Sequence, residues 1–113
     1  HFTGAVAYAN SGATSTNGSQ FYIVNTPDGY MQNTCEELYA ADSTKYNWPA
    51  NVAAKYNKAG GVPFLDGGYT VFGQVFDGMD VVRKIAEVET NPENDKPLTQ
   101  VMMESVRIEE YQG

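Results

Sequence analysis

The chain has 113 residues, 42% of them hydrophobic and 12% aromatic, which is the size and composition of one small globular domain. Fourteen acidic residues against seven basic ones give a net charge of -7, which disfavours nucleic acid and anionic membrane surfaces as partners. The single cysteine, Cys35, excludes an internal disulfide and favours a reducing, cytoplasmic compartment. No apolar run approaches the length of a membrane span, and no charged-then-apolar leader opens the chain.

Two strands are predicted near the N-terminus. Residues 4–10 are small and apolar, with Val6 and Tyr8 on one face, and residues 20–24 are aromatic and β-branched. The connection between them is rich in Gly, Ser and Thr, and its Asn17-Gly18 pair favours a tight reversal. We therefore expect two strands joined by a polar loop.

A long connection follows and needs structure of its own, because connections of about 4–6 residues are typical. Thr34 and Glu37 form a capping box, which predicts a helix through about Ala41. Pro49 suits a first helical position, and a second helix is expected to continue until Gly60-Gly61. Residues 25–62 are therefore predicted to form a helical insertion.

The last third of the chain predicts a strand, a helix and a closing strand. Residues 69–76 have strand character, and Asp77 is expected to cap the helix that follows. Four apolar residues share one face of that helix: Val81, Val82, Ile85 and Val88. A strand is expected at residues 102–108, where Met102, Val106 and Ile108 occupy alternate positions.

Several kinds of catalytic chemistry are disfavoured. The only histidine, His1, lies at a chain end that we expect to be flexible, which argues against a Ser-His-Asp or Cys-His arrangement. A zinc site needs clustered His and Cys ligands, and the one histidine and one cysteine of this chain lie far apart in the sequence. The glycine pairs lack the spacing of a phosphate-binding loop. Cys35 lies beside two glutamates that oppose a thiolate, so we interpret it as a structural thiol. No metal and no cofactor are predicted.

Two blocks of sequence carry a family resemblance. The first runs from Ala9-Asn10 through the polar loop to NGSQFYI at residues 17–23. The second runs from FLDG at 64–67 through VFG at 71–73 to GMDVV at 78–82. Both blocks resemble the signatures of the cyclophilin-type peptidyl-prolyl cis-trans isomerases and occur in the order that this family has. The resemblance covers nearly the whole chain apart from the insertion.

The resemblance implies a mainly β fold with helices. It would be a partial cyclophilin-like antiparallel β-barrel of about four strands, with the amphipathic helix and the inserted helical segment. Residues 1–113 would form a single, truncated domain that contains the insertion at 25–62. A barrel without all its strands has unpaired edges, so we expect marginal stability and self-association through those edges.

The resemblance also implies a groove for proline-containing peptides or proteins. Tyr22, Leu65 and Tyr69 would line part of its proline pocket, and Phe64 would flank the groove. Tyr22 stands where phenylalanine is usual in the family. Its hydroxyl would cost roughly 1–3 kcal/mol if it were buried without a partner, which would weaken proline binding. Ordinary packing in a strand or in the core is the alternative role for these residues.

Three further residues would hold the part of the peptide that precedes the proline: Ala9, Asn10 and Gln20. In the family the role of the asparagine belongs mainly to its main chain, which pairs with an extended peptide in the manner of an added strand. The alternative is that Asn10 only ends a strand.

The family's catalytic arginine has no counterpart in this sequence. Phe-His-Arg and Gln-Gly-Gly-Asp segments precede these blocks in family members, and neither occurs here. Arg83 and Arg107, expected on an exposed helix face and in the closing strand, are not credible substitutes. We therefore expect the parent protein to be a peptidyl-prolyl cis-trans isomerase, with no catalytic residue in this chain and little activity on its own. A non-catalytic module that binds proline peptides, or an inactive fragment, stays open as an alternative.

Overall fold

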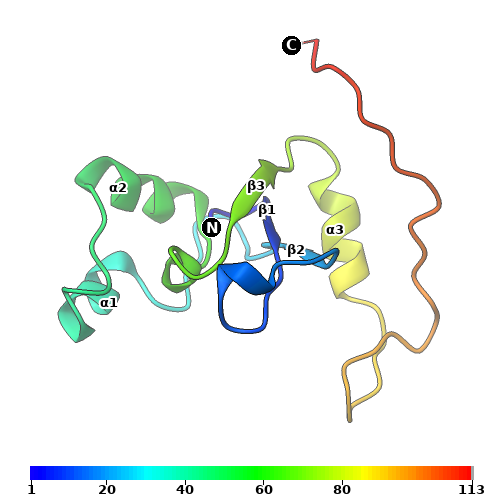
Figure 1. The fold of residues 1–113 in the computed structure, drawn as a ribbon, viewed down its shortest axis with the longest axis horizontal. Helices are drawn as coiled ribbons and strands as arrows, with labels where there is room; N and C mark the ends of the chain where they lie inside the picture. Colours follow the sequence, from blue (N-terminus) through cyan, green and yellow to red (C-terminus); the bar gives the residue numbers. More distant parts are fainter. Residues whose placement is uncertain (113) are drawn as a thin grey trace.

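The computed structural model describes residues 1–112 and has a mixed α/β architecture (Figure 1). Its elements in chain order are β1 (Ala5–Tyr8), the 3-10 turn η1 (Thr14–Thr16), β2 (Phe21–Ile23), α1 (Cys35–Ala41), α2 (Ala50–Ala59), the 3-10 turn η2 (Pro63–Leu65), β3 (Val71–Gln74) and α3 (Met79–Ala86). The three α-helices contain more residues than the three strands. The expectation of a mainly β chain is therefore wrong.

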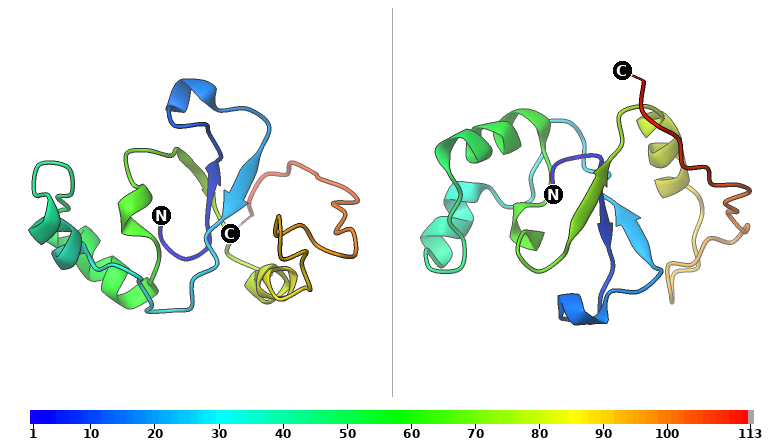
Figure 2. Two further views of the ribbon diagram at one scale, coloured as in Figure 1. Left: turned by 90° about the horizontal axis from the view of Figure 1, so that it is seen from below. Right: turned by 45° about the horizontal axis from the view of Figure 1, so that its top comes forward.

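The sheet has three antiparallel strands in the order β2-β1-β3. The central strand β1 pairs Ala7 with Tyr22 of β2 and Val6 with Gly73 of β3. Helices α1 and α2 lie on one side of this sheet, and α3 with the C-terminal segment lies on the other (Figures 1 and 2). Since β2 and β3 are edge strands, each has one side without a strand partner in the described chain.

The closing strand predicted at residues 102–108 does not form. This segment is irregular, and Met102, Val106 and Ile108 are 65%, 72% and 99% exposed. A strand needs a neighbouring edge to satisfy its N–H and C=O groups, and no part of residues 1–112 pairs with this one. The sheet therefore has three strands in place of the expected four and is not a closed barrel.

Helix α1 begins at the predicted capping box. The Glu37 N–H donates to Thr34 Oγ1 at 3.1 Å, and the Thr34 N–H donates to Glu37 Oε2 at 2.9 Å. These reciprocal bonds satisfy two groups that a helix start otherwise leaves unpaired. The helix also ends at Ala41, as the sequence predicts.

The starts of the other two helices differ by one residue from the prediction. Pro49 occupies the N-cap of α2, one position before the first helical residue, while Gly60 ends that helix with a φ of 80° as expected. Gly78 and not Asp77 is the N-cap of α3, and no side chain caps that helix. The φ of Gly78 is 91°, a left-handed conformation that glycine adopts without strain. The prediction that Asp77 caps α3 is therefore wrong.

The buried core is small. Its apolar members are Ala5, Ala7, Val24, Cys35 and Tyr56. Large side chains on β3, α3 and the C-terminal segment stay exposed, among them Phe76 at 79%. Within residues 1–112, none of the helices is both long enough and apolar enough to span a bilayer.

A hydrogen-bond network centred on Asp66 joins the parts of the chain that this core does not hold together. Its Oδ2 accepts from Trp48 Nε1 at 2.9 Å and from Tyr56 Oη at 2.5 Å. Its Oδ1 accepts from Nδ1 of His1 at 2.7 Å. His1 is only 6% exposed, so the expectation of a flexible first residue is wrong. The network fastens the N-terminus and α2 to the turn that follows η2.

Replacing Asp66 with alanine is expected to lower the free energy of unfolding by about 3 kcal/mol, because several partly buried donors lose a charged acceptor. Urea unfolding followed by circular dichroism measures this loss. Asp77→Ala is the matched control, since the Asp77 side chain is exposed and caps no helix. Its effect should stay within about 0.5 kcal/mol. Equal losses in the two variants would contradict the role given to Asp66.

The stability of the chain should also fall in alkali. Burial, followed by the hydrogen bond to Asp66, raises the pKa of Tyr56 far above its ordinary value of 10.0. Above about pH 10 the unfolded chain loses this proton while the folded chain keeps it, so stability decreases with pH by up to about 1.4 kcal/mol per unit. Tyr56→Phe should flatten this slope in unfolding experiments between pH 9 and 11. Tyr39→Phe, at an exposed position, should leave the slope unchanged.

Candidate functional site

The ends of β1 and β2 bring together three of the predicted groove residues. The Ala9 N–H donates to the Gln20 carbonyl at 3.0 Å, which extends the pairing of the two strands. Ala9, Asn10 and Gln20 then line a hollow of about 290 Å³ together with residues of the loop that joins the strands. The hollow is polar and open to solvent, with Gln20 exposed at its edge.

Asn10 connects this hollow to the second sequence block. Its Nδ2 donates to the Gly68 carbonyl at 2.9 Å, and its Oδ1 accepts from the Gly12 N–H at 2.9 Å. The amide side chain therefore fixes both the start of its own loop and the turn before Tyr69. The sequence pattern pointed only to the main chain of Asn10, and the structure adds this positioning role for its side chain.

Tyr22 and Tyr69 form an aromatic cluster with His1. The two tyrosine rings meet edge to face, with centroids 5.8 Å apart and an interplanar angle of 86°. His1 stacks on Tyr22 at 6.0 Å and meets Tyr69 edge-on at 6.4 Å. Edge-to-face and stacked rings at these separations attract each other beyond their simple burial. Two of the three predicted pocket residues are thus in contact, although they lie 47 positions apart in the chain.

The hydroxyl of Tyr22 is buried without a hydrogen-bond partner among the described residues, which is the unfavourable case considered from the sequence. Burial raises the pKa of Tyr22 to about 12, with smaller contributions from Tyr69 and Asp66. A desolvated phenol with no partner is energetically unfavourable, and it stays protonated at neutral pH.

Leu65 and Phe64 support the same site from η2. The Leu65 carbonyl accepts from the Gly68 N–H at 3.2 Å and from the Tyr69 N–H at 3.3 Å, so it shapes the turn that presents Tyr69. Leu65 is half-buried, whereas Phe64 is 39% exposed. The seven predicted residues do not line one enclosed pocket. Three of them line the polar hollow, two belong to the aromatic cluster, and Phe64 and Leu65 lie in η2. The bond from Asn10 to Gly68 connects the hollow to the turn before Tyr69.

His1 is the member of the site that sequence reasoning missed. Its Nδ1 donates to Asp66, while its Nε2 is buried with no partner among residues 1–112. Because an ionised carboxylate only accepts, this bond places the proton on Nδ1 and fixes the ring against Tyr22. No local pattern around His1 signals its burial, because the contacting residues lie 21 or more positions away.

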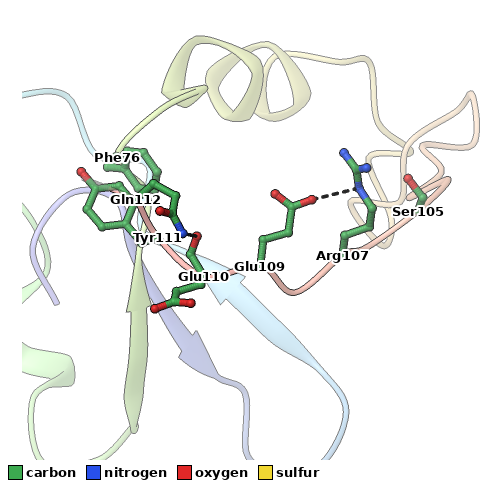
Figure 3. A pocket seen from close by; sticks show the side chains of 7 residues that line it. All are labelled: Phe76, Ser105, Arg107, Glu109, Glu110, Tyr111 and Gln112. Atoms are coloured by element: carbon green, nitrogen blue, oxygen red, sulfur yellow. Dashed lines mark hydrogen bonds and ion pairs between the residues drawn. The ribbon is translucent and has the colours of Figure 1, made fainter.

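Neither arginine lies in the site. Arg83 on α3 donates from Nη2 to Asp28 Oδ1 at 3.0 Å, and Arg107 on the exposed C-terminal segment lies 3.7 Å from Glu109. A separate hollow of about 690 Å³ is lined by Phe76, Ser105, Arg107, Glu109, Glu110, Tyr111 and Gln112 (Figure 3). It contains none of the predicted groove residues.

The Cys35 thiol and the possible metal ligands of the chain show no reactive arrangement in the described residues. Burial raises the pKa of Cys35, and Glu36 adds to this effect, so the thiol is not activated as a nucleophile. In the described part of the chain, no three His, Cys, Asp or Glu side chains are grouped so that they could hold a metal ion. The residues of the hollow and the cluster present aromatic rings, amide side chains and main-chain groups.

The chain is similar to curated bacterial proteins and matches one protein family over most of its length. A protein of Staphylococcus aureus (strain COL), named "Putative peptidyl-prolyl cis-trans isomerase", is 42% identical over 107 residues. A protein of Staphylococcus saprophyticus with the same name is 37% identical over 107 residues. Each match covers 95% of this chain and 50% of the relative, so the chain spans about half the length of the curated relatives it matches. The family described as "Cyclophilin type peptidyl-prolyl cis-trans isomerase/CLD" matches residues 1–108, and the chain belongs to that family.

Proposed function

We propose that this chain supplies part of the peptide groove of a peptidyl-prolyl cis-trans isomerase that acts in protein folding. The observation that carries the proposal is the contact between Tyr22 and Tyr69, beside the hollow of Ala9, Asn10 and Gln20. In this assignment the rings of Tyr22 and Tyr69 and the side chain of Leu65 contact the proline, and Phe64 flanks the groove. Asn10 and its neighbours hold the residues that come before the proline.

The main chain of Asn10 supports this assignment. Within residues 1–112, its N–H and carbonyl make no hydrogen bond, although its side chain makes two. A free donor and acceptor at the end of a strand can pair with an extended peptide as an added strand does. The peptide would then pair with Asn10 beyond the end of β1, since β2 and β3 occupy both edges of that strand, with its proline directed to the aromatic cluster.

Isomerisation requires more than this groove. The barrier to rotation about a peptide bond is roughly 18–20 kcal/mol, because amide resonance is lost in the twisted state. A catalyst must bind the twisted amide more tightly than the planar forms, for example by donating a hydrogen bond to the pyramidal nitrogen. A millionfold acceleration corresponds to roughly 8 kcal/mol of differential binding. We propose that the donor comes from outside these 113 residues, since Arg83 is paired with Asp28 and Arg107 lies on the exposed segment.

A module that binds proline segments without isomerising them is the second candidate function. The position of both arginines away from the groove favours it for the isolated chain. The two candidates differ in catalysis and agree on binding, so they can be separated by a rate measurement. A fragment with no binding function is the third candidate, and a titration distinguishes it from the other two.

A short peptide with one Ala-Pro bond is expected to shift the amide resonances of Tyr22, Leu65 and Tyr69 in the ¹⁵N-labelled chain. The same peptide with alanine in place of proline is the control and should cause much smaller shifts. Exchange spectroscopy on the peptide should show no acceleration of cis-trans interconversion, because the donor to the nitrogen is missing. Acceleration that survives replacement of both arginines would show that no arginine is needed, and unchanged resonances would refute the groove.

Tyr22→Phe is expected to raise the free energy of unfolding by about 1 kcal/mol, because it removes a buried hydroxyl that has no partner. It should also strengthen binding of the Ala-Pro peptide, since the pocket then has an apolar floor. Chemical denaturation and peptide titration measure the two effects. Tyr30→Phe, at a position 53% exposed, should change neither quantity. A loss of stability in Tyr22→Phe would mean that the hydroxyl has a favourable role.

A further inference from the structure

A second hollow lies away from the groove, between the start of β1, the loop that follows β2 and one face of α2. Its volume is about 700 Å³. The residues that line it are Thr3, Asp28, Ala54, Lys55, Lys58 and Ala59. It contains none of the residues assigned to the proline groove, so it is a separate candidate site.

Two lysines give this hollow its charge. Lys55 and Lys58 are exposed, lie three positions apart on α2 and therefore share a face of the helix. Neither makes an ion pair among residues 1–112. The one carboxylate in the lining, that of Asp28, already accepts from Arg83 at 3.0 Å. The two ammonium groups therefore have no ion-pair partner in the described part of the chain, and Asp28, paired with Arg83, is the one acid of the hollow that competes for them.

Each lysine has a local interaction that does not neutralise it. Lys58 lies in the last turn of α2, where a positive charge is favourable beside the helix C-terminus. The Nζ of Lys55 lies 4.9 Å from the centre of the Phe2 ring, a cation–π contact that restricts the side chain. The Lys55 side chain is thus restricted, and the charges of both lysines stay available to an anion.

The charge of the whole chain makes this hollow unusual. The chain has seven basic residues against fourteen acids, and three of those seven, Lys55, Lys58 and Arg83, lie in the hollow or pair with its carboxylate. A local concentration of cations on an acidic protein attracts a short anionic segment. The net charge of -7 opposes a long polyanion such as nucleic acid.

We propose that this hollow binds an acidic segment of a polypeptide. Carboxylates of the segment pair with Lys55 and Lys58. The aliphatic parts of its acidic side chains pack against Ala54 and Ala59, which are small and apolar. Thr3 lies two residues from His1 of the aromatic cluster, so the hollow and the cluster are close along the chain. The proposal does not depend on proline binding, because its ligand contains acidic residues and needs no proline.

The experiment uses a fluorescent peptide with four consecutive acidic residues and no proline, titrated with the 113-residue chain at an ionic strength of about 0.1 M, where the Debye length is about 10 Å. The Lys55→Glu/Lys58→Glu variant should bind it at least about fivefold more weakly, since exposed ion pairs contribute modestly and are here replaced by repulsion. The control is Lys45→Glu/Lys96→Glu, which changes the net charge equally outside the hollow. It also removes one lysine held over an aromatic ring, Tyr46. Its affinity should stay within about twofold of the parent, because distant exposed charges are screened.

A peptide with glutamine and asparagine in place of its acidic residues should not bind. Added salt should weaken the binding of the acidic peptide. Asp28→Asn should strengthen binding about twofold, because it removes the competing carboxylate and releases Arg83. Circular dichroism confirms that each variant is folded. Equal losses in the two double variants would show a nonspecific charge effect and overturn the proposal, as would equal affinity for the neutral peptide.

Discussion

The carboxylate of Asp66 is the point on which the arrangement of this chain depends. It accepts from Trp48 and Tyr56 of the insertion and from His1 at the start of the chain. Hydrogen bonds to a charged acceptor are about twice as strong as neutral ones, and here they connect segments that share few apolar contacts. The buried core has few members, so this network adds to the contacts that hold the helical insertion to the rest of the chain. The hydrogen bonds to Asp66 thus add stability to a fold that buries few apolar side chains.

The same residue sets the geometry of the groove. The bond from His1 to Asp66 fixes the ring that stacks on Tyr22, and the turn that begins at Asp66 continues to Tyr69. Asn10 then fastens this turn to the end of β1 through the Gly68 carbonyl. The aromatic cluster and the polar hollow are therefore two ends of one hydrogen-bonded framework. A change in either end would be transmitted to the other through the short turn between them.

Local features could be predicted from the sequence, and features that depend on distant partners could not. The capping box at Thr34 and the stop at Gly60 each involve a few neighbouring residues, and both are present. The strand expected at Met102 to Ile108 needs to pair with a distant edge, and the alternation of its residues does not say whether the segment reaches one; it pairs with neither β2 nor β3. The burial of His1 depends likewise on a carboxylate 65 positions away. For the site, the sequence blocks identified Tyr22 and Tyr69, but only coordinates show that they meet.

Binding and catalysis are separable in this architecture. A surface can bind the planar cis and trans forms and the twisted amide equally well. Such a surface does not accelerate their exchange, because the barrier between bound states is unchanged. In the proposed groove the rings of Tyr22 and Tyr69 would contact the proline in every state, whereas a donor to the amide nitrogen acts only when resonance is lost. The arginine pairing of Arg83 with Asp28 shows that a guanidinium on α3 already has a structural task. A groove of this kind therefore supplies affinity and orientation, and it becomes a catalyst only when a donor is positioned over the bond it holds.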